Sequence, residues 1–233
     1  MTGKVSSKII VLSENIEKKW IGLRSLALQN AKLNSNIKDF ISLAALNRPE
    51  SEEFDEKAQI DAAEVIYEVF KDTKPTYILG VGNAGIEFSQ ATHRVFGQHH
   101  TKIGYGVVKN YEMRIEKKPE VGTLFHSTSY TRTGVISYLI PTLPAKSKVL
   151  IVDDVCAYGS ISIAVSQELT KLGADVVGLG VYINKDWQNG LIKFTEKTGA
   201  PSFSVVRIEA IDHNANKINL VPQSNALSRF ELV

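Results

Sequence analysis

The stretch that decides the fold is Val149-Leu-Ile-Val-Asp-Asp-Val-Cys-Ala-Tyr-Gly-Ser-Ile161. Its first four residues are apolar and predict a buried strand. Two carboxylates, Asp153 and Asp154, follow directly. A small-residue turn then leads into an amphipathic helix that begins near Ile161 and ends at Gly173. We therefore expect both carboxylates at the carboxyl end of a parallel strand, where open α/β sheets bind their ligands.

The turn after the carboxylates has the composition of an anion site. It joins strand to helix, so its backbone N–H groups should lie at a helix N-terminus, which favours phosphate. Its residues are Ala157, Tyr158, Gly159, Ser160 and Ile161. Carboxylates that bind a diol or a metal beside a phosphate cradle indicate a sugar phosphate. Two other interpretations of the carboxylates stay open, a metal pocket like that of a phosphoryl-accepting receiver and a solvated strand end.

Composition narrows the class of protein. At 233 residues with 43% hydrophobic content, we expect one domain plus an embellishment. A net charge of +2 predicts no whole-surface field for nucleic acid or membrane, and no apolar run reaches the roughly 20 residues of a membrane span. The single cysteine, Cys156, excludes an intramolecular disulfide framework and fits a reducing cytoplasm.

Strands and helices alternate along the chain. We expect helices at 13–29, 56–72 and 85–96, and strands at 76–81, 103–108, 149–152, 176–183, 203–208 and 217–221. Residues 110–133 are polar and interrupted by Lys117-Lys-Pro119, which predicts a long excursion that closes over the site as a hood. The alternation predicts a doubly wound, mainly parallel sheet.

A glycine motif offers a competing interpretation. Gly80-Val-Gly82-Asn-Ala-Gly85 lies between a predicted strand and helix and matches the dinucleotide-binding pattern. That pattern also needs an acidic residue at the end of the next strand. Here that strand ends in Lys109-Asn110, and the first acid is Glu112. A tight strand–helix turn is the plainer alternative, and a second phosphate loop on the same sheet edge is the one we favour.

The acidic motif resembles the signature of type I phosphoribosyltransferases, and the nearest likeness is to the bacterial xanthine phosphoribosyltransferase family. That family has an apolar strand ending in two Asp, an Ala-x-Gly loop, a Gly-Ala turn, a Gly-rich strand and an Ile-x-Lys. The matching pieces here are Asp153-Asp154-Val-Cys-Ala157-Tyr158-Gly159, Gly173-Ala174, Gly178-Leu-Gly180 and Ile183-Asn184-Lys185. The resemblance runs, with gaps, from about Leu46 to Ile208.

The resemblance implies a fold, a reaction and a set of sites. Residues 57–233 would form the transferase core, and residues 1–56 a helical segment that joins the C-terminal part in a small hood over the base. The reaction would need phosphoribosyl pyrophosphate, a purine base and Mg²⁺. Asp153 and Asp154 would bind the ribose hydroxyls and Mg²⁺, directly or through water, and residues 157–161 would bind the 5′-phosphate. Pyrophosphate would contact Gly82, Asn83, Ala84, Gly85, Lys109 and Arg132, and the base would contact Leu46, Asn47, Lys185 and Trp187.

Base choice would depend on Lys185. An ammonium only donates hydrogen bonds, so it suits the O6 acceptor of a 6-oxopurine and opposes the amino group of adenine. Xanthine therefore ranks first, then guanine or hypoxanthine. Ala157 stands where related hypoxanthine–guanine enzymes carry an Asp, so we assign no general base. Plainer interpretations remain for Lys185 as a surface lysine, Asn47 as a turn former and Arg132 as a loop charge.

Other functions remain open at this point. An adenine or orotate phosphoribosyltransferase would share most of these motifs. A non-catalytic regulator that senses phosphoribosyl pyrophosphate would keep the pocket without turnover, although no basic patch precedes Leu46. From the family we also expect a cytoplasmic homodimer.

Overall fold

The computed structural model describes residues 12–30, 32–33, 41–42, 52–82, 85–100, 102–111, 122–128, 135–212 and 217–222. The elements in chain order are α1 (Glu14–Asn30), β1 (Lys32–Leu33), β2 (Ile41–Ser42), α2 (Glu52–Phe70), the 3₁₀ turn η2 (Lys71–Thr73), β3 (Tyr77–Val81), α3 (Ile86–His99), β4 (Gly104–Asn110), β5 (Gly122–Thr128), β6 (Val135–Pro141), β7 (Lys148–Cys156), α4 (Ser160–Lys171), β8 (Asp175–Lys185), the 3₁₀ turn η3 (Asp186–Gln188), α5 (Gly190–Thr198), β9 (Ser202–Asp212) and β10 (Lys217–Leu220).

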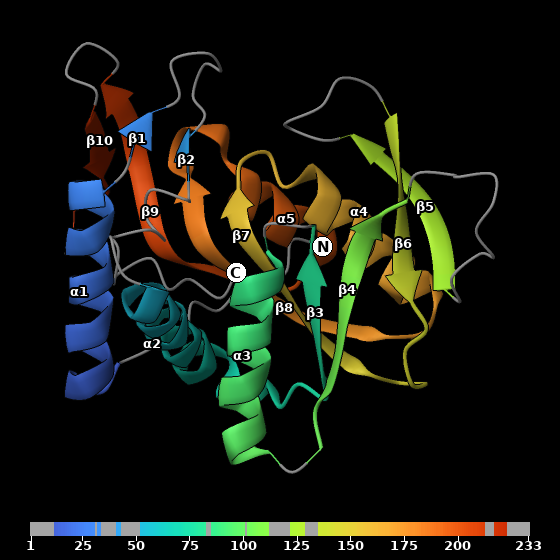
Figure 1. The fold of residues 1–233 in the computed structure, drawn as a ribbon. Helices are drawn as coiled ribbons and strands as arrows, with labels where there is room; N and C mark the ends of the chain where they lie inside the picture. The colour runs from blue at the N-terminus through green and yellow to red at the C-terminus, as the bar shows by residue number, and fades with distance from the viewer. Residues whose placement is uncertain are drawn as a thin grey trace, which may run out of the picture.

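One eight-stranded sheet organises the molecule, with the strand order β10-β9-β8-β7-β3-β4-β6-β5 (Figure 1). The central strands β9, β8, β7, β3 and β4 run parallel. The flanking strands β10, β6 and β5 join them in antiparallel pairs. The predicted doubly wound, mainly parallel sheet is confirmed.

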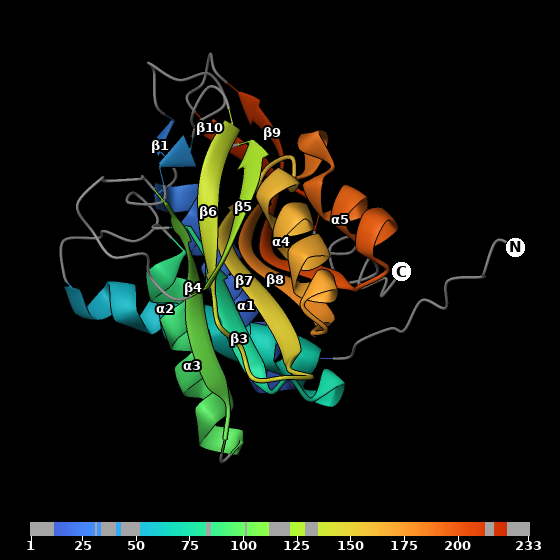
Figure 2. The same cartoon turned by 90° about the vertical axis from the view of Figure 1, so that its right-hand side faces the viewer.

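Helices cover both faces of the sheet (Figure 2), with α1, α2 and α3 on one face and α4 and α5 on the other. The buried strand β7 shows why its sequence is apolar throughout: Leu150 and Val152 pack toward the first face, and Val149 and Ile151 toward the second. Strands buried on both faces lose the polar–apolar alternation of half-exposed strands. The apolar run that opened the sequence analysis is therefore the centre of the fold.

Small residues let α2 approach the sheet closely. A Cβ on Gly178 of β8 would lie 2.3 Å from the Phe70 ring, and one on Gly180 would lie 3.1 Å from Ile66. Phe70 and Ile66 are both fully buried on α2. The Gly-x-Gly of β8 is therefore a packing feature that seats α2 against the strand.

Several element boundaries differ from the prediction. Strand β7 continues through Cys156, and β8 continues through Lys185, so the predicted strand ends were too early. Helix α2 begins at Glu52, ahead of the predicted start at residue 56, and α3 continues to His99. The extensions of β7 and β8 are paired with neighbouring strands, which a local pattern does not reveal, and helix ends are the least predictable part of a helix.

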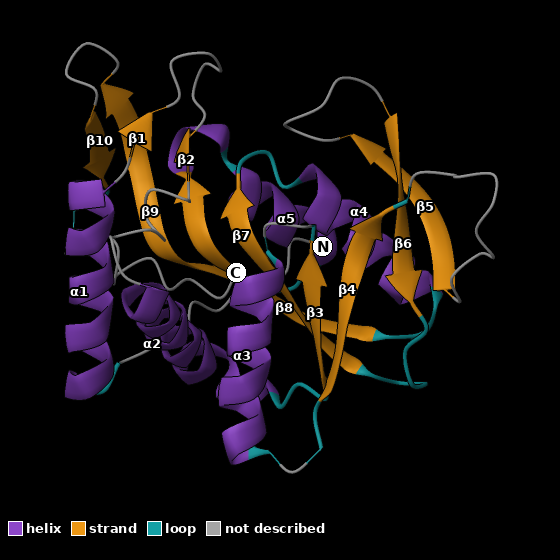
Figure 3. Ribbon diagram, in the orientation of Figure 1, coloured by secondary structure: helices purple, strands orange, loops and turns teal. Residues whose placement is uncertain are grey.

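The prediction of one long polar excursion over residues 110–133 was wrong for the part that the structure describes. Residues 122–128 form β5, which pairs with β6 from Gly122↔Pro141 to Thr128↔Val135 (Figure 3). Neither β6 nor helix α5 was anticipated. Strand β5 is mostly polar because one face looks to solvent, while Phe125 stacks on Tyr138 at a centroid distance of 5.4 Å. A strand at a sheet edge with one solvent-facing side has no continuous apolar run, so its sequence does not indicate a strand.

Candidate functional site

The parallel strands bring the predicted site residues to one edge of the sheet. Val152 of β7 lies between Gly80 of β3 and Gly180 of β8 in the hydrogen-bonded register. The residues that follow in each strand therefore share one edge, at the carboxyl ends of the arrows in Figure 3. This is where open parallel sheets place their ligands.

The acidic pair occupies a place where β7 has lost one neighbour. Pairing with β3 ends at Gly80↔Val152, whereas pairing with β8 continues to Cys156↔Asn184. Asp153 and Asp154 thus lie inside a strand, where the sequence had predicted a strand end. The sheet opens beside them because β3 has already turned away into α3. The carboxylates are held rigidly by β8 and remain partly exposed to solvent.

The electrostatics of the pair favour a cationic or hydroxyl-bearing ligand. Burial and the charge of Asp154 raise the pKa of Asp153 well above its ordinary value, and burial raises the pKa of Asp154. In the part of the chain that the structure describes, no lysine or arginine forms an ion pair with either carboxylate. Two adjacent carboxylates that pair with no described lysine or arginine suit a metal ion or hydroxyl donors.

The turn after β3 lies directly against this pair. A Cβ on Gly85 would lie 3.3 Å from Oδ1 of Asp153 and 2.4 Å from the carbonyl oxygen of Val81. Gly82 adopts a left-handed conformation with φ of 70°, and its N–H donates to Val108 O over 3.1 Å. Glycine is favoured here because the turn needs a positive φ and close backbone approach.

Of the other residues predicted to bind pyrophosphate, one lies in a described strand and three do not. Lys109 of β4 is exposed and follows Val108, whose carbonyl binds Gly82, so it lies beside the turn. Asn83, Ala84 and Arg132 lie outside the described residues. The structure therefore places Gly85 close to Asp153 and Gly82 beside the end of β4, where Lys109 lies, and the pyrophosphate-binding role of all six residues stays a prediction.

The loop from β7 to α4 has the geometry of a phosphate cradle. Gly159 precedes α4 with φ of 71°, and the helix begins at Ser160. The glycine is also sterically required, because a Cβ there would lie 2.7 Å from Gly190 O at the start of α5. Ala157 is buried in the same contact, while Tyr158 is half-exposed. The loop is thus clamped by α5 and presents the N-terminus of a three-turn helix at the sheet edge.

Two flanking contacts were not anticipated from the sequence. Lys193 of α5 places Nζ 5.4 Å from the centre of the Tyr158 ring and donates to Gln188 O over 3.0 Å. On the other side, Ser127 of β5 contacts Ser160 O at 3.5 Å, so the hairpin borders the loop. Helix α5 was not predicted, although the spacing of Leu191, Phe194 and Thr195 is a signal that could have indicated it and hence Lys193.

The predicted base-binding residues lie at the end of β8. Lys185 is the last residue of the strand, paired with Ile208 of β9, and only 2% of it is exposed. It is therefore not a surface lysine, and its predicted place just past the strand end was wrong. Trp187 follows in η3, partly buried against the core. Leu46 and Asn47 lie outside the described residues.

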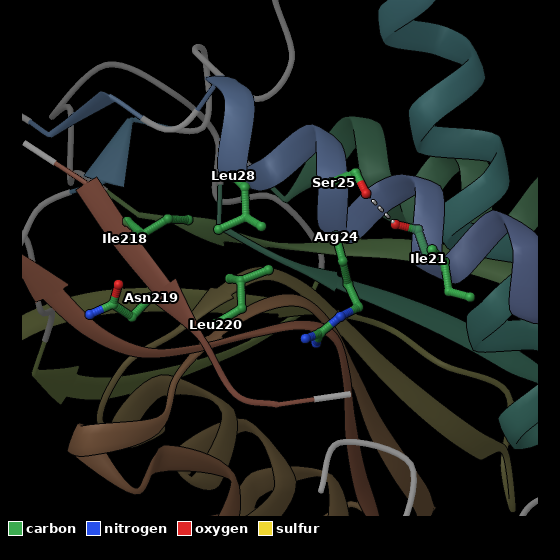
Figure 4. A pocket seen from close by; sticks show the side chains of 7 residues that line it. All are labelled: Ile21, Arg24, Ser25, Leu28, Ile218, Asn219 and Leu220. Carbon is green, nitrogen blue, oxygen red and sulfur yellow. Dashed lines mark hydrogen bonds between the residues drawn. The ribbon is translucent and has the colours of Figure 1, made fainter. Parts of the chain in front are cut away.

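A separate cavity of about 390 Å³ lies between α1 and β10 (Figure 4). Its walls are Ile21, Arg24, Ser25, Leu28, Ile218, Asn219 and Leu220. None of the residues predicted for the site lines it. Cys156 is buried at the end of β7, and burial raises the pKa of its thiol. No described helix combines the length and apolar composition needed to cross a membrane.

Comparison with known protein families identifies the domain. The family model described as "Phosphoribosyl transferase domain" matches residues 50–214. A xanthine phosphoribosyltransferase of Staphylococcus carnosus is 28% identical over 169 residues, which cover 72% of this chain and 84% of that protein. A xanthine phosphoribosyltransferase of Listeria monocytogenes is 33% identical over 94 residues, covering 39% of this chain and 48% of that protein.

Solved structures show the same architecture. The adenine phosphoribosyltransferase of Thermoanaerobacter pseudethanolicus superposes with a TM-score of 0.63 at 18% identity, covering 79% of this chain and 99% of that one. The adenine phosphoribosyltransferase of Saccharomyces cerevisiae, complexed with an imino-altritol bisphosphate and adenine, gives a TM-score of 0.62 at 23% identity, covering 81% and 99%. At these identities the likeness concerns the fold alone.

Proposed function

We propose a function that follows from family membership: this chain belongs to the phosphoribosyl transferase domain family. The reaction is transfer of the 5-phosphoribosyl group of phosphoribosyl pyrophosphate to a purine base, giving a nucleotide and pyrophosphate. The observation that carries the proposal is the close approach of Gly85 to Asp153, where a Cβ on the glycine would lie 3.3 Å from Oδ1, so that the glycine turn and the acidic pair share one sheet edge.

In this reaction the bond from C1 of the ribose to the pyrophosphate oxygen breaks, and a bond from C1 to a purine ring nitrogen forms. Positive charge develops on C1 as the first bond breaks. The carboxylates of Asp153 and Asp154, held by β8, stabilise that charge through the ribose hydroxyls. The α4 N-terminus and the Gly82–Gly85 turn hold the two phosphate ends in place, so the reacting atoms stay aligned. The nitrogen that attacks loses its proton to solvent or to the leaving group.

The acidic pair also fits Mg²⁺, which we propose as the cofactor. Mg²⁺ prefers oxygen ligands, keeps several waters and is commonly held by one or two carboxylates together with substrate phosphates. Among the described residues there is no cluster of three candidate ligands, so Asp153 and Asp154 would bind the ion with water and substrate oxygens completing its shell. The bound ion would neutralise charge on the departing pyrophosphate.

For the base we propose a 6-oxopurine, with xanthine first. Two observations support this choice. The sequence relatives named above are xanthine phosphoribosyltransferases, and Lys185 supplies a buried donor at the end of β8. The adenine enzymes among the structural neighbours are too distant in sequence to argue for adenine. A donor held away from water discriminates strongly between the O6 of xanthine and the amino group of adenine.

One assay tests the reaction and the base together. The protein is incubated with labelled phosphoribosyl pyrophosphate, Mg²⁺ and, separately, xanthine, guanine, hypoxanthine, adenine or orotate. We expect nucleotide from xanthine at the highest kcat/KM. Preferred use of adenine or orotate would overturn the base assignment, and donor binding without any product would indicate a sensing regulator. A cytoplasmic homodimer remains our expectation for the assembly, to be checked by sedimentation and cell fractionation.

A further inference from the structure

The turn that follows β8 needs a fixed position if Lys185 and Trp187 are to meet a base. Lys185 ends the strand, and the short η3 turn follows, closed at its end by a backbone bond from Asn189 N to Asp186 O at 3.1 Å. A three-residue 3₁₀ turn has little stability of its own. Its position must therefore come from side chains.

Asp186 supplies that anchor. Its Oδ1 accepts from Arg207 Nε at 3.0 Å and from Asn184 Nδ2 at 2.6 Å, and its Oδ2 accepts from Arg207 Nη2. Only 17% of the Asp186 side chain and 15% of the Arg207 side chain are exposed. A two-pronged guanidinium–carboxylate pair fixes the orientation of both groups, unlike a single point contact.

The anchor spans two strands. Asn184 and Arg207 are register partners on β8 and β9, one residue before the pair Lys185↔Ile208. The Asn184 amide is oriented by Asp186, because a carboxylate accepts only from the amide nitrogen. Oδ1 of Asn184 stays buried without a partner among the described residues. The orientation of the Asn184 amide therefore satisfies Nδ2, which donates to Asp186, and leaves Oδ1 without a described donor.

The guanidinium of Arg24 lies near that of Arg207, which increases the need for the Asp186 carboxylate to balance the charge. Burial and the nearby charge of Arg207 lower the pKa of Arg24. Arg24 lies 4.9 Å from the centre of the Trp20 ring and donates through Nη2 to Val221 O. Without Asp186, the Arg207 guanidinium would keep its charge near that of Arg24 without the carboxylate that now pairs with it.

We propose that Asp186 and Arg207 are positioning residues that hold the Lys185–Trp187 turn in the geometry that binds the purine base. The inference rests on the proposed role of Lys185 in base binding. The pair touches neither the acidic motif nor the α4 loop in any described contact. Its loss should therefore weaken the base and spare the phosphoribosyl donor.

Steady-state kinetics of Arg207→Gln and Asp186→Asn test this division. We expect KM for the preferred purine to rise about tenfold, which is the loss of about one charge-assisted hydrogen bond, with KM for phosphoribosyl pyrophosphate changed less than about twofold. The ranking of purines should stay as in the wild type, because Lys185 is still present. Arg207→Lys keeps the charge without the two-pronged contact and should fall between. The matched control, Arg94→Gln, removes an exposed arginine–carboxylate pair with Glu56 and should change neither KM.

Tryptophan fluorescence gives a readout that needs no turnover. The chain has two tryptophans, so Trp20→Phe leaves Trp187 as the only reporter. Adding Arg207→Gln to this variant should increase acrylamide quenching of Trp187, and Arg94→Gln should not. Unchanged quenching, or an equal rise of both KM values with a lower melting temperature, would overturn the proposal. If the wild type made no nucleotide from any base, the proposed function would fail, and quenching alone would decide whether the pair positions the turn.

Discussion

The donor end and the base end of the candidate site are built from different materials. The donor end consists of Gly82 and Gly85, the acidic pair and the α4 N-terminus, and Gly82 and Gly159 shape its backbone through their positive φ. The base end consists of Lys185 and Trp187, two side chains on a short turn. Their position depends on Arg207, which lies on another strand. Backbone sites are encoded locally, whereas side-chain sites need distant support.

The two ends also differ in their electrostatic state. At the donor end, no lysine or arginine in the described part of the chain is ion-paired with Asp153 or Asp154, and burial raises the pKa of both carboxyls. At the base end, the Asp186 carboxylate is fully engaged by Arg207 and Asn184. The acidic pair is therefore suited to binding a ligand, whereas the Asp186 carboxylate is suited to holding the η3 turn in place. Charge changes should therefore affect catalysis at one end and geometry at the other.

The largest effect should come from the acidic pair. Asp153→Asn with Asp154→Asn should lower kcat/KM about 10²–10³-fold or more, the range for removing one preorganised electrostatic group. Circular dichroism should show an intact fold, because neither side chain makes an ion pair in the described structure. The control Asp175→Asn alters an exposed carboxylate at the opposite end of β8. A double variant with near-normal rates would show that the donor end lies elsewhere.

The next effect concerns the base end. Lys185→Gln should lower kcat/KM for xanthine by about one to two decades, since a charge-assisted hydrogen bond contributes about 1.5–3 kcal/mol. The amide of Gln offers both donor and acceptor, so rejection of adenine should weaken. KM for phosphoribosyl pyrophosphate serves as the internal control for folding. If variant and wild type ranked the purines in the same order, Lys185 would not select the base, and the proposed division between donor end and base end would be wrong.

A pH experiment separates ligand binding from stability at the donor end. The pKa of Asp153 is raised in the folded protein, so ionisation is less favourable there than in the unfolded chain. This carboxyl therefore lowers stability increasingly as pH rises above the ordinary value of 3.8 towards the folded-state pKa. Asp153→Asn should raise the melting temperature of the ligand-free protein at pH 7, and the gain should disappear below pH 3.8. A variant that melts lower than the wild type at pH 7 would contradict this sign.

The smallest effect concerns the cation beside the phosphate loop. Lys193→Met should raise KM for phosphoribosyl pyrophosphate about two- to fivefold, since partly exposed charge contacts contribute about 0.2–1 kcal/mol. KM for the base should change less than about twofold, because Asp186 and Arg207 still hold η3 when the Lys193–Gln188 contact is lost. Lys197→Met, an exposed lysine on the same helix, is the matched control. Equal effects of the two substitutions would mean that α5 only clamps the loop.

Local sequence predicted the central elements well and the flanks poorly. The strands β3, β4 and β7, the helix α4 and its closing glycine were recognisable because apolar runs and glycine turns are contiguous signals. The hairpin β5–β6 and helix α5 were missed. Strand β5 is mostly polar because one of its faces looks to solvent, and α5 has only nine residues, which is a short window for recognising a helical periodicity.

The sequence by itself determined the doubly wound sheet, the acidic pair and the two glycine turns, because each depends on residues adjacent in the chain. Only the tertiary structure decided that β7 loses β3 before Asp153, that Lys185 is buried at the end of β8, and that Arg207 holds Asp186. The physical reason is that burial, pKa and ion pairing depend on which strands become neighbours. Strand neighbours in a parallel sheet are joined through long crossovers, so no local pattern records them.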